Sequence, residues 1–280
     1  MKFNRVLFMG SPDFAVPTLK ALVDFFGISK IVGVVSQPVK VRGRGRELSP
    51  TPVHQFAHSL GLTVFTPESK EEVASVVEML QPDLVVVIAY GMILPKSVTD
   101  HYLCVNLHGS LLPSYRGASP MQAAILAGDT ETGVTLIRMN ERMDAGEILS
   151  LARIPLSVEE TLGQLHDRLC ELSAEVMINY LKGACPTPVF QDETLATYCK
   201  KIQKDALQLD LSGDARSSVR KVKAFSPVPG AYVSKDGRRV KVLDARVENE
   251  KFVPILVKPE GKSEMTYEDY VRGYGEFSNF

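Results

Sequence analysis

The sequence lacks any hydrophobic run long enough to cross a bilayer. Its longest apolar run covers residues 84–89, far short of the roughly 20 residues that a membrane-spanning helix needs. The first residues lead directly into a strand pattern rather than into the charged and apolar segments of a secretory signal. We therefore expect a cytoplasmic protein without a membrane partner.

Cysteine is scarce. The four cysteines, Cys104, Cys170, Cys185 and Cys199, are too widely spaced for a zinc motif. In a reducing compartment they are most simply free thiols in or near the core. We expect no metal site.

An overall excess of one charge sign is also absent, because 32 Lys and Arg residues face 33 Asp and Glu residues. The distribution is uneven, however. Residues 200–246 hold 12 basic and 5 acidic side chains, whereas residues 1–199 hold 16 and 21. This pattern predicts a basic surface for a polyanion in the C-terminal part. Chance clustering of solvated charges is the alternative.

What the chain does have is typical of a folded globular protein, with 45% hydrophobic and 23% charged residues over 280 positions. This composition excludes a disordered or collagen-like chain. The length predicts two domains of unequal size. We place a large N-terminal domain at residues 1–190, a linker at 191–205 and a small C-terminal domain at 206–280.

The N-terminal part alternates between apolar runs and helical patterns. The apolar runs cover residues 5–9, 31–35, 62–65 and 84–88. This alternation predicts an α/β domain with a doubly wound, mostly parallel, Rossmann-like sheet, which binds ligands beyond the carboxyl ends of its strands. Ser11 followed by Pro12 is typical of a helix start, so we expect Ser11 to cap the first helix.

The C-terminal part follows a break in periodicity at residues 182–188, which are rich in glycine, proline and small residues. Short strand patterns come after it at residues 230–233, 239–242 and 253–257. They predict a small, OB-like β-barrel.

Gly10 lies where a nucleotide-binding turn would be, after the first strand. The second and third glycines of the dinucleotide fingerprint are missing from this turn. A tight strand-to-helix turn is therefore at least as good an interpretation as a nucleotide site.

Asn106 and His108 share one face of a predicted strand, because side chains alternate along a strand. The chain leaves the strand at Gly109, so the pair lies at the carboxyl end. This pattern alone fits a catalytic pair and a satisfied structural pair equally well.

Residues 106–120, which read NLHGSLLPSYRGASP, resemble the signature of the folate-dependent formyltransferases. Residues 89–95, 133–135 and 143–146 are similar to further segments of that family. The resemblance implies catalytic roles for Asn106, His108 and Asp144, with 10-formyltetrahydrofolate as the formyl donor. The expected folate contacts are Ala89, Tyr90, Gly91, Ser110, Leu111, Leu112 and Pro113.

The resemblance also bears on the acceptor. A short basic loop holds Lys40, Arg42, Arg44 and Arg46, and basic side chains of this kind neutralise phosphates. A solvated loop is the alternative. Together with the basic C-terminal part, the loop resembles family members that formylate initiator methionyl-tRNA. We expect Phe14 and Leu94 to help form the methionine pocket, and a monomeric enzyme.

Three other functions remain open. A formyltransferase acting on a small amine, such as a ribonucleotide or an amino-sugar nucleotide, would share the catalytic residues without needing two basic surfaces. An NAD-dependent oxidoreductase would fit the sheet but expects the full glycine fingerprint. A non-catalytic RNA-binding protein would not need Asn106, His108 and Asp144 to converge.

Overall fold

The computed structural model describes residues 3–42, 47–183, 187–235 and 237–277. The chain forms two compact units. The first contains Met1–Arg116, Gly133–Arg153 and Asp167–Tyr198, and the second contains Gly117–Thr132, Ile154–His166 and Cys199–Phe280. Neither unit is one continuous stretch of sequence.

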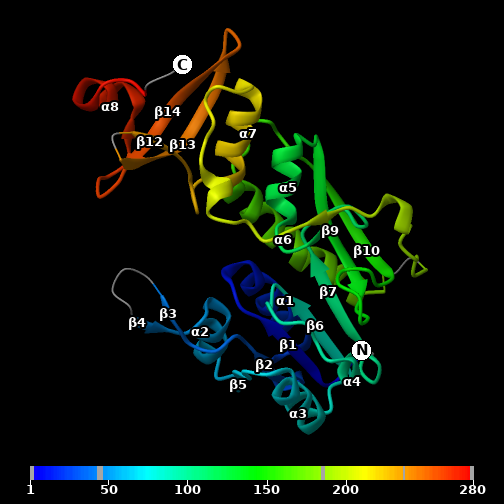
Figure 1. Cartoon of the computed structure of the whole chain (residues 1–280). Coiled ribbons are helices and arrows are strands. Elements are labelled where there is room, and N and C mark those ends of the chain that lie inside the picture. Colours follow the sequence, from blue (N-terminus) through cyan, green and yellow to red (C-terminus); the bar gives the residue numbers. More distant parts are fainter. Residues whose placement is uncertain (1–2, 43–46, 184–186, 236, 278–280) are drawn as a thin grey trace. The chain divides into compact units, whose positions relative to one another are not determined.

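A seven-stranded sheet is the centre of the α/β fold (Figure 1). Its strands lie in the order β10-β9-β7-β6-β1-β2-β5. The neighbours from β7 to β5 pair in parallel, and β9 pairs antiparallel to β7. The predicted doubly wound, mostly parallel sheet is therefore confirmed. The strands are β1 (Val6–Gly10), β2 (Ile31–Val35), β5 (Val64–Phe65), β6 (Leu84–Ile88), β7 (Cys104–His108), β9 (Glu131–Arg138) and β10 (Ile148–Pro155).

The central strands are buried along their whole length. Every residue of β1 and of β6 is buried, as their continuous apolar runs predict. The helices along this part of the chain are α1 (Val16–Phe26), α2 (Pro52–Ser59), α3 (Lys70–Leu80), α4 (Lys96–Thr99), α5 (Pro120–Ala127) and α6 (Leu162–Leu181), with the 3-10 turns η1 (Asp13–Ala15), η2 (Ile28–Lys30) and η3 (Glu193–Leu195). Helices α2 and α3 begin at caps, where Thr51 and Ser69 accept backbone N–H bonds.

The expected helix cap at Ser11 is wrong. The chain first forms η1, whose cap position is Pro12, and α1 begins at Val16. The Ser11 hydroxyl instead donates to the carbonyl of Tyr90 at 3.1 Å and accepts the Gln37 N–H at 3.1 Å. Ser11 therefore joins the loops that follow three neighbouring strands, which a local cap pattern does not reveal.

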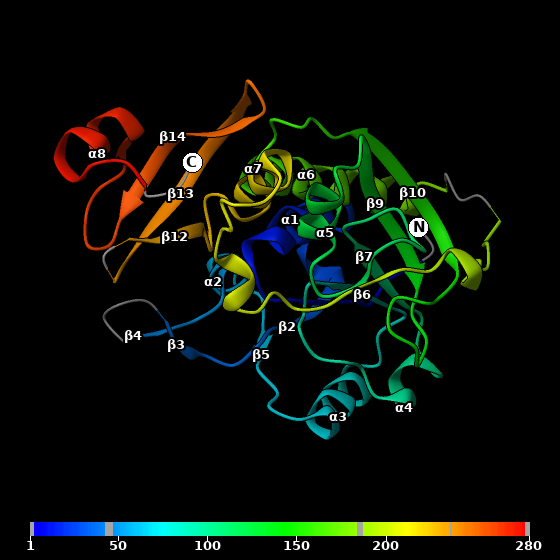
Figure 2. The same ribbon diagram turned by 45° about the horizontal axis from the view of Figure 1, so that its top comes forward.

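The segment after β2 holds a short hairpin of β3 (Lys40–Arg42) and β4 (Glu47–Ser49) (Figure 2). In the backbone register of this antiparallel hairpin, Lys40 lies opposite Ser49, and Arg42 lies opposite Glu47. Arg44 and Arg46 of the expected basic loop lie outside the described residues.

The second unit contains a four-stranded antiparallel sheet in the order β12-β13-β14-β15. The antiparallel C-terminal sheet is confirmed; among the described residues its strand order runs from β12 to β15 without closing into the expected barrel, and Gln208 forms a parallel bridge with Tyr232 of β12. Helices α5 and α7 lie against each other, and α7 also lies against β13. The elements are the 3-10 turn η4 (Asp205–Leu207), α7 (Ala215–Phe225), β12 (Ala231–Lys235), β13 (Arg238–Glu248), β14 (Lys251–Pro259), β15 (Met265–Thr266) and α8 (Tyr267–Tyr274). Two-stranded pairing joins β8 (Arg116–Gly117) to β11 (Tyr198–Cys199).

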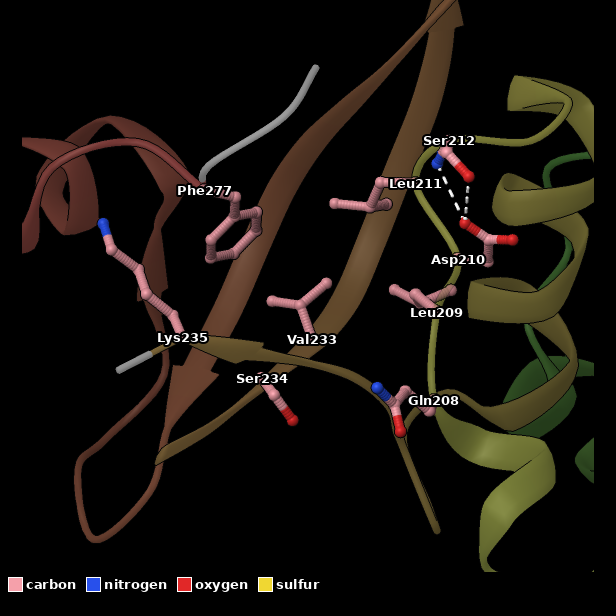
Figure 3. Close-up of a pocket in the computed structure, with 9 residues that line it drawn as sticks. All are labelled: Gln208, Leu209, Asp210, Leu211, Ser212, Val233, Ser234, Lys235 and Phe277. Carbon is pink, nitrogen blue, oxygen red and sulfur yellow. Dashed lines mark hydrogen bonds between the residues drawn. The ribbon is translucent and has the colours of Figure 1, made fainter. Parts of the chain in front are cut away.

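A pocket of about 420 Å³ lies on this small sheet (Figure 3). Its lining includes Val233, Lys235 and Phe277. The Lys235 ammonium donates to the backbone carbonyls of Tyr274, Gly275 and Glu276, so its charge holds the end of α8 against β12. None of the predicted catalytic residues lines this pocket.

Within the described residues, Cys104, Cys170 and Cys199 form no disulfide bond. Burial raises the pKa of Cys104 and of Cys170 to about 12. These two thiols therefore stay protonated and unreactive at neutral pH. Cys185 lies outside the described residues.

Gly133 on β9 has no room for a side chain, because an added Cβ would lie 2.0 Å from the Ala152 carbonyl oxygen and 2.7 Å from the Leu111 side chain. We predict that Gly133→Ala lowers the free energy of unfolding by about 1–3 kcal/mol, as overpacking usually does. Urea unfolding followed by circular dichroism measures it. Gly213→Ala is the control, because its nearest neighbour is 3.9 Å away. Superimposable curves for Gly133→Ala and the wild type would contradict this prediction.

Candidate active site

The carboxyl end of β7 carries Asn106 and His108 on the same strand face, as the alternation predicts. Asn106 is partly buried and His108 is 7% exposed. Strand β6 lies beside β7 in parallel, so the loop after Ile88 and the loop after His108 leave the sheet at one edge. This edge is where a doubly wound sheet binds ligands.

Asp144 comes from the loop between β9 and β10 and meets both side chains. The Asn106 amide donates to Asp144 Oδ1 at 3.4 Å, and His108 Nδ1 lies 3.6 Å from Asp144 Oδ2. Asp144 has left-handed backbone, with φ 52°. The structure thus brings together the three residues that the sequence singled out as catalytic.

The other ring nitrogen of His108 contacts the backbone. Nε2 lies 2.8 Å from the carbonyl oxygen of Tyr115. A carbonyl oxygen can only accept, so Nε2 carries the hydrogen in this bond. In the neutral ring Nδ1 then has the lone pair, on the side where Asp144 lies.

The loop after β7 is held by internal hydrogen bonds. The Ser110 hydroxyl donates to the Ser114 carbonyl at 2.6 Å. The Thr135 hydroxyl donates to the Ser110 carbonyl at 2.7 Å and accepts the Leu112 N–H at 3.1 Å. Thr135 therefore fixes the expected folate-binding segment, whose Leu111 and Pro113 are partly buried and whose Leu112 is buried.

The loop after β6 turns through left-handed backbone at Ala89 (φ 46°) and Gly91 (φ 86°), both exposed. The Tyr90 side chain between them is 2% exposed and packs in a core cluster with Leu94. Burial raises the pKa of Tyr90 to about 12. Tyr90 and Leu94 are thus part of the core, and it is the backbone around them that can face a ligand.

The remaining predicted binding residues lie on other elements than the catalytic group. Phe14 is 6% exposed and lies in η1. Lys40 and Arg42 belong to β3, but the structure does not describe their side chains.

Sequence reasoning missed a segment that braces the site. We call residues 187–198 the strap. Val189 exchanges two backbone hydrogen bonds with Ile148, at 2.8 and 3.0 Å. The Gln191 amide donates to the carbonyls of Asp144 and Gly146, each at 2.8 Å. The loss of periodicity predicts a linker at residues 191–205, which include most of this segment.

A buried arginine connects the strap to the loop after β7. The Arg116 guanidinium is fully buried and donates to Gln191 Oε1 at 2.8 and 3.0 Å. It also pairs with both oxygens of Glu193, each at 3.0 Å. Hydrogen bonds from Arg116 and Arg142 lower the pKa of Glu193 to about 2. This carboxylate is therefore charged throughout the physiological range.

The arrangement suits acyl chemistry. An amide N–H can stabilise a developing oxyanion, and an imidazole beside a carboxylate can take up a proton. Within the described residues there is no cluster of three or more His, Cys, Asp or Glu side chains that could hold a metal ion. Among the described helices, none combines the length and apolar character that crossing a bilayer requires.

Comparison with known proteins gives the family. Residues 4–181 match the formyl transferase family, and residues 201–254 match the formyl transferase C-terminal domain. The chain is 44% identical over 250 residues to the methionyl-tRNA formyltransferase of Methylococcus capsulatus, covering 87% of this chain and 80% of that protein.

Two solved structures share the fold at low sequence identity. The methionyl-tRNA formyltransferase from Clostridium thermocellum is 17% identical, with a TM-score of 0.65 over 91% of this chain and 98% of that one. The N-formyltransferase from Helicobacter canadensis, solved with folinic acid and dTDP-3-aminofucose, is 16% identical, with a TM-score of 0.66 over 88% of both chains. On the strength of the sequence matches, this chain belongs to the methionyl-tRNA formyltransferase family of formyl-transferring enzymes.

Proposed function

We propose that Asn106, His108 and Asp144 transfer the formyl group of 10-formyltetrahydrofolate to the α-amine of methionine on initiator methionyl-tRNA. The observation that carries this proposal is the convergence of the three side chains at the carboxyl end of β7, with Asp144 within 3.4–3.6 Å of both others. The product is formylmethionyl-tRNA, which serves translation initiation in the cytoplasm.

Asn106 stabilises the transition state. Attack of the amine on the formyl carbon gives a tetrahedral species whose oxygen becomes negatively charged. The Asn106 amide has two hydrogens, and its 3.4 Å bond to Asp144 uses one of them. The other can meet the oxyanion, and this bond strengthens as the charge develops.

His108 removes the proton from the attacking amine. Because Nε2–H is bonded to Tyr115, the lone pair of Nδ1 is the base. When Nδ1 takes a proton the ring becomes a cation, and the Asp144 carboxylate at 3.6 Å compensates its charge. The cationic ring can return this proton to the leaving nitrogen, so no covalent intermediate is needed.

The folate fits the backbone between the loops after β6 and β7. Exposed Ala89 and Gly91 offer peptide groups, and the Ser110–Pro113 segment, which Thr135 holds in place, bounds the folate on the other side. We assign the buried Phe14 and Leu94 to the methionine pocket. The donor set at Asn106 and His108 fits a formyl oxygen and an amine.

The tRNA meets two basic regions. One is the loop with Lys40, Arg42, Arg44 and Arg46, and the other is the C-terminal part with its surplus of basic side chains at 200–246. Residues 1–190 thus act as the catalytic domain, 191–205 as the linker and 206–280 as the tRNA-binding domain of a monomer.

An acceptor of another kind is the second candidate. The Helicobacter canadensis neighbour was solved with an amino-sugar nucleotide, so a small amine acceptor is the alternative to exclude. It would need the catalytic group but not the basic regions.

Loss of His108 tests the catalytic assignment. We predict that His108→Ala lowers kcat for methionyl-tRNA formylation by about 100-fold or more, because general base catalysis typically contributes 10²–10⁴-fold. Asn106→Ala should lower it by about 10²–10³-fold, through loss of an oxyanion donor. Single-turnover formyl transfer measures both. His101→Ala is the matched control, because His101 is an exposed histidine bonded to the Ser97 carbonyl. Equal rates in His108→Ala and His101→Ala would refute the assignment.

Charge reversal tests the RNA surface. We predict that Lys200→Glu/Lys201→Glu raises KM for methionyl-tRNA several-fold and flattens its salt dependence, since each lost phosphate contact reduces the salt slope by about one. KM for the folate should not change. Lys251→Glu/Lys262→Glu makes the same change in net charge at exposed positions outside residues 200–246. An equal rise in KM for both double variants would show a general charge effect rather than a surface.

A further inference from the structure

The strap forms hydrogen bonds with Tyr115 and Asp144, the two residues that contact the ring nitrogens of His108. Both residues have left-handed backbone conformation. Tyr115 has φ 60° and Asp144 has φ 52°. Residues other than glycine seldom adopt this conformation and keep it only where their surroundings impose it. The strap supplies such surroundings on both sides of the imidazole.

Thr197 holds the Tyr115 side. Its hydroxyl accepts the Tyr115 N–H at 2.8 Å, and its carbonyl accepts the Arg116 N–H at 2.9 Å. The peptide plane between Tyr115 and Arg116 is thus fixed at its N–H end by the strap. At its other end the same plane presents the Tyr115 carbonyl to His108 Nε2. Thr197 therefore sets the direction of the bond that selects the His108 tautomer.

Gln191 holds the Asp144 side. Its amide nitrogen donates to the Asp144 carbonyl and to the Gly146 carbonyl, each at 2.8 Å. These two bonds fix the left-handed turn from which the carboxylate reaches His108 and Asn106. The Gln191 side chain is 9% exposed, so few other partners compete for it.

Arg116 links the Thr197 contact at Tyr115 to the Gln191 contact at Asp144. Its guanidinium donates to Gln191 Oε1, which leaves the Gln191 amide nitrogen oriented toward the Asp144 turn. The orientation is unambiguous because guanidinium only donates and carbonyls only accept. Glu193 of the strap then neutralises the buried Arg116 cation.

We propose that Gln191 and Thr197 are positioning residues of the formyl transfer reaction, which fix the orientation of Asp144 and the tautomer of His108 through the backbone. The expected effect on the reaction rate rests on the proposed function. The expected effect on the His108 tautomer does not depend on it. The strap is thus a functional part of the active site.

Gln191→Glu separates positioning from folding. The new carboxylate keeps the acceptor for Arg116 but loses both N–H donors and places negative charge against the Asp144 and Gly146 carbonyls. We expect kcat to fall about 10- to 100-fold, since small misplacement of a catalytic group has effects of that size. KM for methionyl-tRNA and for the folate should stay unchanged.

Asp192→Asn is the matched control on the same strap. Within the described residues, the Asp192 carboxylate bonds inside the strap, to the Thr194 N–H at 2.9 Å and to the Thr194 hydroxyl at 2.7 Å. It should keep wild-type kcat. Equal losses in Gln191→Glu and Asp192→Asn would overturn the proposal, because they would show a general need for strap stability.

Thr197→Val and Thr197→Ser test the other side. Valine keeps the shape and the backbone bonds but removes the hydroxyl acceptor, so kcat should fall about two- to tenfold. Serine restores the acceptor and should restore the rate. A Thr197→Ser protein as slow as Thr197→Val would contradict the role of the hydroxyl.

The ring nitrogens of His108 give a readout that needs no substrate. In protein labelled with ¹⁵N-histidine, with the resonance assigned by its loss in His108→Ala, the neutral ring should show a protonated Nε2 and an unprotonated Nδ1. Thr197→Val should add signal of the opposite tautomer. An unchanged spectrum in both Thr197→Val and Gln191→Glu would overturn the proposal. If the spectrum changes in these variants but the wild-type protein transfers no formyl group to methionyl-tRNA, the result supports the positioning role of the strap. It then contradicts the proposed function instead.

Discussion

The hydrogen bond from His108 Nε2 to the Tyr115 carbonyl is the contact on which the site depends. It determines which ring nitrogen carries the hydrogen, and hence that the basic nitrogen Nδ1 lies beside Asp144 and Asn106. In the other tautomer, the lone pair would lie on Nε2, on the side of the loop backbone. Nδ1 could then not act as the base of the proposed reaction.

That contact requires a costly backbone. Tyr115 and Asp144 both have positive φ, and such residues cost roughly 1–3 kcal/mol each. The surrounding hydrogen bonds offset this cost: Thr197 holds the peptide at Tyr115, and Gln191 holds the turn at Asp144. The buried Arg116 links both, with Glu193 as its counter-charge. The strained backbone and the hydrogen bonds that stabilise it therefore lie at the same place, as is common at functional sites.

The sheet was largely predictable from sequence because the strands that build it are continuous apolar runs. Residues 31–35 and 84–88 were predicted with the observed bounds, since nothing polar interrupts them. Asn106 and His108 could be paired because a strand alternates with period two. Asp144 could not be placed by pattern, since no local signal predicts that a turn 38 residues downstream of Asn106 meets it; the family resemblance supplied it.

The features that sequence patterns missed have a common physical origin. Ser11 has the residue type of a cap but bonds to loops that are remote in sequence. The segment after residue 182 loses its periodicity, which predicts a linker, but a lost periodicity says nothing about long-range bonds such as those of Gln191 and Thr197. The barrel prediction followed from short strands alone, and strand patterns do not determine whether a sheet closes.

The most direct test of the account is formyl transfer from 10-formyltetrahydrofolate to methionyl-tRNA, measured beside free methionine and an amino-sugar nucleotide at matched concentrations. The account predicts kcat/KM for the charged tRNA at least 100-fold above that for either small amine, because the small amines make no contact with the basic regions. Faster transfer to a small amine would contradict it: the catalytic group would remain, but tRNA would not be the acceptor.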